Sequence, residues 1–197
     1  TIVDEIRNVH TGSVYSVDWS SDGRYIASGS NDKLVKITSG QIPTGPFRIQ
    51  SSLKGHTGTV RVVKFSPHPA ILASGGSGDC KLRVWDVNQG ALLKDLTPHE
   101  DDIHAVDWIA DTVVLSGCEK GLLMAHDLRT SSPIWNVDLT NQDEAGGICS
   151  FYCNQGTDLS IIGHSNGGIS LFDIRTRRVL QTQIIHKNDI RSVCMWS

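Results

Sequence analysis

Short stretches in which apolar and polar residues alternate recur along the chain. One of them, SVYSVDWS at 13–20, is followed by YIASGS at 25–30 and by KLVKIT at 33–38. The turn-forming segments SSDG and ND separate the three stretches. Alternation with a period of two predicts β-strands that bury one face, and no segment has the sustained 3.6-residue period of a helix. The sequence therefore predicts an all-β protein.

This set of strands repeats along the chain. The copies share an apolar pair, a tight turn and a second alternating stretch, and they lie at 26–38, 72–86, 114–127 and 161–173. A histidine precedes the first strand of most copies, at His10, His56, His99 and His186. The histidines recur about every 43–46 residues, with one absent near Glu144, and a period of 40–45 residues with four strands per unit is typical of propeller blades.

The repeats divide the chain into blade-like units. Their approximate bounds are 10–53, 56–97, 99–140 and 144–185, with a partial fifth unit from 186. The second unit has Gly55-His56 before its first strand and Trp85-Asp86 at the end of its third, and in these residues it resembles the WD-repeat family. The resemblance implies a β-propeller of about four blades with partial blades at both ends, which we expect to form part of a seven-bladed ring.

The same resemblance implies a buried structural hydrogen-bond network within each blade. In the second unit the matching residues are His56, Ser74, Asp79 and Trp85. The first unit keeps His10, Ser28 and Asp32, with Thr38 in place of the tryptophan. The third keeps His99 and Ser116, with Lys120 for the acid and His126 for the tryptophan, and the fourth has Asn166 and Phe172 but no histidine. The glycine-rich turn at 75–78 precedes a strand rather than a helix, so we interpret it as a turn and not as a phosphate loop.

Composition and charge narrow the possible functions. The formal net charge is -3, which argues against nucleic acid as the partner, and no apolar run of about 18 residues predicts membrane insertion. The five cysteines have no disulfide-framework, zinc or redox spacing, which favours a reducing, cytoplasmic location. The sequence predicts no nucleophile elbow, and its eight histidines form no H-x-x-x-H spacing and no cluster with cysteine. The sequence therefore predicts no catalytic residues, no cofactor and no metal, and thus a protein that is not an enzyme.

The family resemblance implies that proteins or peptides bind on the face that carries the turns between the second and third strands, here called the top face. Candidates are the residues at the start of each first strand and in those turns that strand alternation leaves unburied. They are Tyr15, Arg61, His104, Arg191, Asn31, Asp102, Glu119 and Asp189. Tyrosine and arginine are typical of interface hot spots. The alternative for any one of these residues is a solvated surface without a partner.

Two sharper resemblances lead to different functions. WSSDGRYIASGSNDKLVK, HDLR and LFDIRTRRVLQTQIIHKNDIRSV are similar to successive segments of a microtubule-associated WD-repeat propeller, which implies a scaffold in microtubule or ciliary assemblies and a cytoskeletal or ciliary location. The tetrapeptides HDLR and FDIR resemble the W-D-x-R boxes of substrate receptors of cullin-type ubiquitin ligases. In that alternative the ligase adaptor would be contacted by Asp127, Arg129, Asp173 and Arg175.

Overall fold

A computed structural model describes residues 5–40, 46–96, 99–140, 145–154 and 156–194 of the 197-residue chain. In these residues, sixteen strands form four antiparallel sheets of four strands each, and every strand pairs with its neighbours in chain order. The all-β prediction is confirmed, and each sheet has the strand order of a propeller blade. Of the expected unit boundaries, those at 97 and 144 lie outside the described residues.

Each sheet consists of four short consecutive strands. The first contains β1 (Val14–Trp19), β2 (Tyr25–Ser30), β3 (Val35–Ser39) and β4 (Arg48–Leu53). The second contains β5 (Thr59–Phe65), β6 (Ile71–Ser77), β7 (Leu82–Asp86) and β8 (Ala91–Leu96). The third contains β9 (Ile103–Ala110), β10 (Val113–Cys118), β11 (Leu122–Asp127) and β12 (Pro133–Asp138). The fourth contains β13 (Ile148–Cys153), β14 (Leu159–His164), β15 (Gly168–Asp173) and β16 (Arg178–Ile184).

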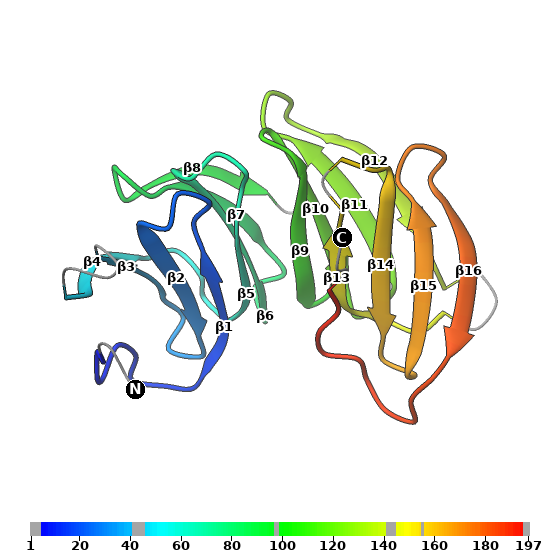
Figure 1. The fold of residues 1–197 in the computed structure, drawn as a ribbon, viewed down its shortest axis with the longest axis horizontal. Helices are drawn as coiled ribbons and strands as arrows, with labels where there is room; N and C mark the ends of the chain where they lie inside the picture. The colour runs from blue at the N-terminus through cyan, green and yellow to red at the C-terminus, as the bar shows by residue number, and fades with distance from the viewer. Residues whose placement is uncertain (1–4, 41–45, 97–98, 141–144, 155, 195–197) are drawn as a thin grey trace.

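The sheets stand side by side in an arc, with β1, β5, β9 and β13 toward the middle and β4 and β16 at opposite ends (Figure 1). Three clusters of buried residues fill the spaces between neighbouring sheets. One cluster joins the first and second sheets, one joins the second and third, and one joins the third and fourth. The largest side chains in these layers, Trp85, Trp108 and Phe172, are almost completely buried. The core therefore lies between the sheets, as alternation within the strands requires.

Neighbouring sheets interlock through a small residue on one side and a β-branched residue on the other. The glycine stands in the second strand of one sheet, and the β-branched residue stands at the start of the next first strand or in the segment after β16. The pairs are Gly29–Val60, Gly75–Ile103, Gly117–Ile148 and Gly163–Ile190. A Cβ on any of these glycines would lie 2.6–2.8 Å from a methyl carbon of its partner, so a side chain does not fit there.

One face of the first sheet is uncovered in the described part of the chain. The apolar side chains of β1 that face away from the second sheet are Val14, Val17 and Trp19, and they are 49%, 65% and 45% exposed. Their counterparts in β5 are Val60, Val63 and Phe65, and these are buried against the first sheet. The exposed side chains line an apolar groove of about 360 Å³ together with Ile6 and Phe47.

The partial fifth unit does not begin with a strand in the described residues. Residues 186–194 have no strand assignment, although the sequence predicts a first strand there. A strand needs a paired neighbour for its backbone hydrogen bonds, and no described segment pairs along this one. Ile190 nevertheless takes the place that Val60 and Ile103 take in other sheets, because its N–H bonds to His164 O at 3.1 Å and its side chain covers Gly163.

Aspartate side chains also connect neighbouring sheets. Asp18 in β1 accepts a hydrogen bond from Phe65 N at 2.7 Å, and Asp107 in β9 accepts one from Cys153 N at 2.7 Å. Lys64 lies between them, with its Nζ 3.3 Å from Asp18 Oδ1. Burial raises the pKa of Asp107, and the hydrogen bond from Cys153 and the charge of Lys64 partly oppose that rise. Each aspartate thus satisfies a backbone donor of the next sheet that no strand partner reaches.

We expect Asp107→Ala to lower the free energy of unfolding by about 1–3 kcal/mol, because it leaves the buried Cys153 N–H without its acceptor. Urea unfolding followed by tryptophan fluorescence measures the change. Asp111→Ala is the control, since Asp111 is an exposed turn residue directly after β9, and it should be neutral within about 0.5 kcal/mol. Equal midpoints for both variants would contradict a role for Asp107 in joining the sheets.

Candidate functional site

Side chains from the sheets converge on one small cavity at the top face. Four of them directly follow the β-branched residue that packs on a glycine of the preceding sheet, and Tyr15 follows the equivalent residue of β1, Val14. The five residues are Tyr15 in β1, Arg61 in β5, His104 in β9, Cys149 in β13 and Arg191 after β16. Because the first strands lie next to one another, equivalent positions meet, and all five residues line a cavity of about 160 Å³, here called the channel cavity.

Arg61 is held in place at this cavity. Its Nε donates a hydrogen bond to Ser77 Oγ at 2.8 Å, and its guanidinium carbon lies 4.9 Å from the centre of the Tyr15 ring. The first contact joins β5 to β6, and the second joins the second sheet to the first. A guanidinium over an aromatic ring is a cation–π contact. Arg61 is therefore a partly buried, oriented side chain rather than the freely exposed one that the sequence predicts.

Arg191 differs from Arg61 because it is mostly solvated. Its side chain is 86% exposed, and its Nε bonds to Asp189 Oδ2 at 2.8 Å. Asn31, Asp102, Glu119 and Asp189 are not among the residues that line the channel cavity. Asp102 and Glu119 belong to the third sheet's top edge, where His104 also lies. The structure thus brings Tyr15, Arg61, His104 and Arg191 of the eight candidates to the cavity, while the other four lie beside it or in turns.

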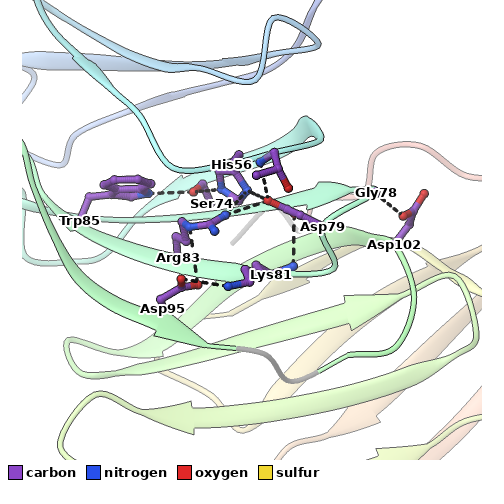
Figure 2. Close-up of polar contacts among 10 residues, drawn as sticks. His56, Ser74, Gly78, Asp79, Lys81, Arg83, Trp85, Asp95 and Asp102 are labelled. Atoms are coloured by element: carbon purple, nitrogen blue, oxygen red, sulfur yellow. Dashed lines mark hydrogen bonds and ion pairs between the residues drawn. The ribbon is translucent and has the colours of Figure 1, made fainter.

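The predicted network residues of the second sheet lie within hydrogen-bonding distance of one another (Figure 2). His56 Nδ1 lies 2.8 Å from Asp79 Oδ2, and its Nε2 lies 2.8 Å from Ser74 Oγ. Trp85 Nε1 donates to the same Ser74 Oγ at 2.8 Å. In the tautomer with a proton on Nδ1, Nδ1–H donates to Asp79 and Nε2 accepts from the Ser74 hydroxyl, so the hydrogen bonds among these four side chains are all made. This chain of bonds connects the segment before β5 with β6, β7 and the turn between them.

Arg83 is a further member of the network that sequence reasoning missed. Its side chain is only 4% exposed, and NH1 donates to Asp79 Oδ2 at 2.8 Å (Figure 2). Burial by itself raises the pKa of Asp79, but the hydrogen bonds from His56, Arg83 and the backbone of Thr57 hold that pKa well below its usual range. A charged carboxylate therefore neutralises a buried guanidinium. One feature of the sequence points to this role: Arg83 stands two positions before the buried Trp85, so alternation along β7 places it on the same interior face.

The network of the first sheet has the three predicted members. His10 Nδ1 lies 2.9 Å from Asp32 Oδ2, and its Nε2 lies 2.8 Å from Ser28 Oγ. Burial raises the pKa of Asp32, but the hydrogen bonds from His10 and from backbone N–H groups more than offset this and leave the pKa lowered. Lys36, the counterpart of Arg83, donates to Val9 O instead of joining the acid. The first-sheet network therefore contains no buried cation.

The third and fourth sheets use neutral histidines. His99 Nε2 lies 2.8 Å from Ser116 Oγ, and burial lowers the pKa of both His99 and His126 to about 4. In the fourth sheet the sequence predicts no histidine, yet His164 of β14 lies 2.7 Å from Ser170 Oγ through Nε2 and 3.0 Å from Gly146 O through Nδ1. Burial lowers the pKa of His164 as well. In the fourth sheet, a histidine of the second strand thus replaces the histidine that precedes the first strand in the other three sheets.

The ligase-receptor alternative assigns the adaptor contact to four residues at or just beyond the ends of the third strands in two adjacent sheets. Asp127 ends β11 and accepts hydrogen bonds from the backbone N and the Nε of Arg129, both at 2.9 Å. Asp173 ends β15 and accepts one from Thr176 N at 2.9 Å, while Arg175 Nε lies 3.6 Å from Asp158. Each aspartate therefore stabilises the turn that follows its own strand.

The sequence profile described as "WD domain, G-beta repeat" matches residues 4–39 and 47–86. These segments contain β1–β3 and β4–β7. The match and the relatives given next support the WD-repeat family for this chain. Proteins of WD repeats serve as protein-interaction scaffolds.

Three curated relatives illustrate the similarity. The chain is 29% identical to "Protein transport protein SEC31" of Candida glabrata over 139 residues, which is 64% of the chain and 11% of that protein. It is 26% identical to a bromodomain and WD repeat-containing protein of Dictyostelium discoideum over 177 residues, 89% of the chain and 7% of that protein. It is 30% identical to "THO complex subunit 3" of Arabidopsis thaliana over 126 residues, 64% of the chain and 40% of that protein.

The chain spans less than half the length of each of these relatives. The described residues contain no helix of the length and hydropathy that a membrane crossing requires.

Proposed function

We propose that this chain is a non-enzymatic scaffold that binds a protein or peptide at the channel cavity. The observation that carries the proposal is the convergence of Tyr15, Arg61, His104 and Arg191 from four separate segments on one cavity. Arg61 is held by Ser77 and Tyr15, so it loses little conformational freedom when a partner binds. Arg191 is exposed and adds a cation at the rim.

For the partner, we propose a microtubule-associated or ciliary assembly and a cytoplasmic, cytoskeletal location. The support is the resemblance of several segments, among them the one at 171–193, to the C-terminal propeller of nemitin, a microtubule-associated WD-repeat protein. The relatives bear names from protein transport, from a bromodomain protein and from the THO complex. Because these names differ so widely, they favour the scaffold class without favouring one partner.

Co-sedimentation with purified microtubules tests this proposal. We expect the chain to enter the pellet in proportion to microtubule concentration, and Arg191→Glu to weaken binding at least tenfold, because it reverses a charge at the cavity rim. Arg178→Glu is the matched control, since it makes the same change of charge on β16, away from the cavity. Both variants should melt at the wild-type temperature.

Two results would contradict this proposal. If the wild-type chain does not pellet with microtubules, the microtubule partner is wrong. If Arg178→Glu weakens binding as much as Arg191→Glu does, binding responds to overall charge and not to the cavity.

A substrate receptor of a cullin-type ubiquitin ligase is the alternative function. The observation in its favour is that Arg129 and Arg175 are each 74% exposed and lie near the same end of adjacent sheets, beyond β11 and β15. Pull-down of purified ligase adaptor by the wild-type chain, with loss in the Arg129→Ala, Arg175→Ala double variant, would favour it. Absence of adaptor binding at micromolar concentrations would eliminate it.

A further inference from the structure

Three side chains with metal-binding atoms meet at the top edge of the third sheet. The candidate ligand atoms of Asp102, His104 and Glu119 all lie within 4.8 Å of one another, and His104 Nε2 is 3.9 Å from Glu119 Oε2. In the described part of the chain, this is the one group of three or more such residues. The sequence predicts no metal site, because Glu119 is far from Asp102 and His104 along the chain and the histidines form no H-x-x-x-H spacing and no cluster with cysteine.

The strand pairing explains why these residues meet. Asp102 directly precedes β9 and His104 is the second residue of β9. Residues two positions apart in an extended segment have their side chains on the same side. Glu119 directly follows β10, whose last residue, Cys118, pairs with Ile103. The backbone N–H of Glu119 also donates to Asp102 O at 3.1 Å. The hairpin therefore brings both carboxylates close to the imidazole, and a backbone hydrogen bond holds Glu119 beside Asp102.

Two details favour a binding site over a set of solvated charges. His104 Nε2 is buried and has no hydrogen-bond partner, although the side chain as a whole is 20% exposed. A buried polar atom without a partner is unfavourable, by about 1–3 kcal/mol. The carboxylate of Asp102 is oriented by a hydrogen bond from Gly78 N at 2.8 Å, and an oriented carboxylate is a typical feature of metal ligands. Figure 2 shows this bond reaching Asp102 from the second sheet.

We propose that Asp102, His104 and Glu119 bind a divalent transition-metal ion of the Zn²⁺ type. Bonds of about 2.0–2.2 Å from zinc to nitrogen and oxygen place ligand atoms about 3–4 Å apart, which the 3.9 Å between His104 and Glu119 already meets. The ligand atoms of the three residues are at most 4.8 Å apart, so closing around an ion requires a movement of at most about 1.4 Å, which the Glu119 side chain can make because it is 58% exposed. Three protein ligands leave a fourth position for water or a group from a partner.

The donor set and the local charges favour this class of ion. One imidazole and two carboxylates suit Zn²⁺ and its neighbours, whereas Ca²⁺ requires six to eight oxygen ligands. Cys149 lines the nearby channel cavity but does not belong to the group of three whose ligand atoms lie together, so it is not a ligand in this proposal. Of the two arginines at the same cavity, Arg191 is paired with Asp189 and Arg61 is bonded to Ser77.

Isothermal titration of the metal-free chain with ZnCl₂ at pH 7 tests the proposal. We expect one Zn²⁺ per chain, with the affinity at least tenfold lower in both Glu119→Gln and His104→Ala. Glu119 is exposed, so Glu119→Gln folds normally and decides the result even if His104→Ala is unstable. His68→Ala is the control, because His68 lies in the turn between β5 and β6 and outside the metal-binding group, and it should bind Zn²⁺ as the wild-type chain does.

Co²⁺ in place of Zn²⁺ gives a second readout. Oxygen and nitrogen ligands produce only weak visible bands, whereas a cysteine ligand produces an intense thiolate charge-transfer band in the near ultraviolet. We expect the weak bands alone, and their loss in Glu119→Gln. The proposal is overturned by a dissociation constant above 1 mM for the wild-type chain, by unchanged affinity in Glu119→Gln, or by the thiolate band. None of these readouts depends on the scaffold's partner.

Discussion

Replacing Asp79 with alanine should lower the free energy of unfolding by about 3–5 kcal/mol. Losing a buried hydrogen-bond acceptor alone costs about 1–3 kcal/mol. Asp79 is also the nearer of the two carboxylates beside Arg83, at 2.8 Å from a side chain that is 4% exposed, whereas Asp95 lies 3.6 Å away and is 37% exposed. Removing the nearer partner of a buried charge is destabilising by about 3–5 kcal/mol. Urea unfolding at pH 7, followed by tryptophan fluorescence, measures the loss.

The first sheet provides the matched control for this experiment. Asp32 occupies the same network position, bonded to His10, but no buried cation accompanies it because Lys36 bonds to Val9 O. Asp32→Ala should therefore cost only about 1–3 kcal/mol. Replacing Arg83 by leucine in the Asp79→Ala background should recover part of the loss, since it removes a buried charge that has lost its nearer partner. Equal losses in Asp32→Ala and Asp79→Ala would show that Arg83 adds nothing.

The same carboxylate makes stability depend on pH in a defined direction. The pKa of Asp79 is lower in the folded chain than its unfolded value of about 3.9. Its contribution is therefore fully present above about pH 4 and is lost as the pH falls toward the folded pKa. The difference in stability between the wild-type chain and Asp79→Asn should accordingly shrink below pH 4. A difference that is constant from pH 7 to pH 3 would contradict the assigned ion pair.

The strands and their repeat could be predicted from the sequence because both depend on local pattern. Period-two alternation at 13–20 predicts a half-buried strand, and Ser, Asp and Gly at 20–23 predict the turn that follows. Four copies of this pattern then predict four similar sheets. The segment at 189–193 has the same pattern but no strand assignment, because pairing depends on a neighbouring segment and not on the pattern alone.

Side-chain partners could be predicted only where the repeat itself specifies them. His56, Ser74, Asp79 and Trp85 follow from the family pattern. Arg83 and His164 do not, because their contacts depend on which face of a strand is buried and on the neighbouring loop. The group of Asp102, His104 and Glu119 was missed for a similar reason, since the hairpin of β9 and β10 brings Glu119 to two residues that are distant along the strands.

Gly117→Ala should destabilise the protein by about 3 kcal/mol, the upper end of the usual cost of overpacking. The new Cβ would lie 2.6 Å from Ile148 Cγ2 and 3.1 Å from a ring carbon of Phe151, both in the layer between the third and fourth sheets. Ile148 is completely buried and has no free space to move into, so the sheets must separate slightly. Thermal and urea unfolding measure the effect.

A second substitution distinguishes a steric cause from a change in backbone flexibility. Ile148→Ala alone should cost about 2–5 kcal/mol through the cavity it creates. Because it also removes the methyl group that the new Cβ meets, the double variant should be at least 1 kcal/mol more stable than the sum of the single losses predicts. Gly168→Ala is the control and should cost less, since the nearest atoms there are Asn166 Oδ1 at 3.0 Å, which accepts a hydrogen bond from Gly168 N, and the end of the Ile184 side chain at 3.2 Å, and neither contact is as short as the 2.6 Å at Gly117. Strict additivity of Gly117→Ala and Ile148→Ala would show that the glycine is not required by the packing of one sheet on the next.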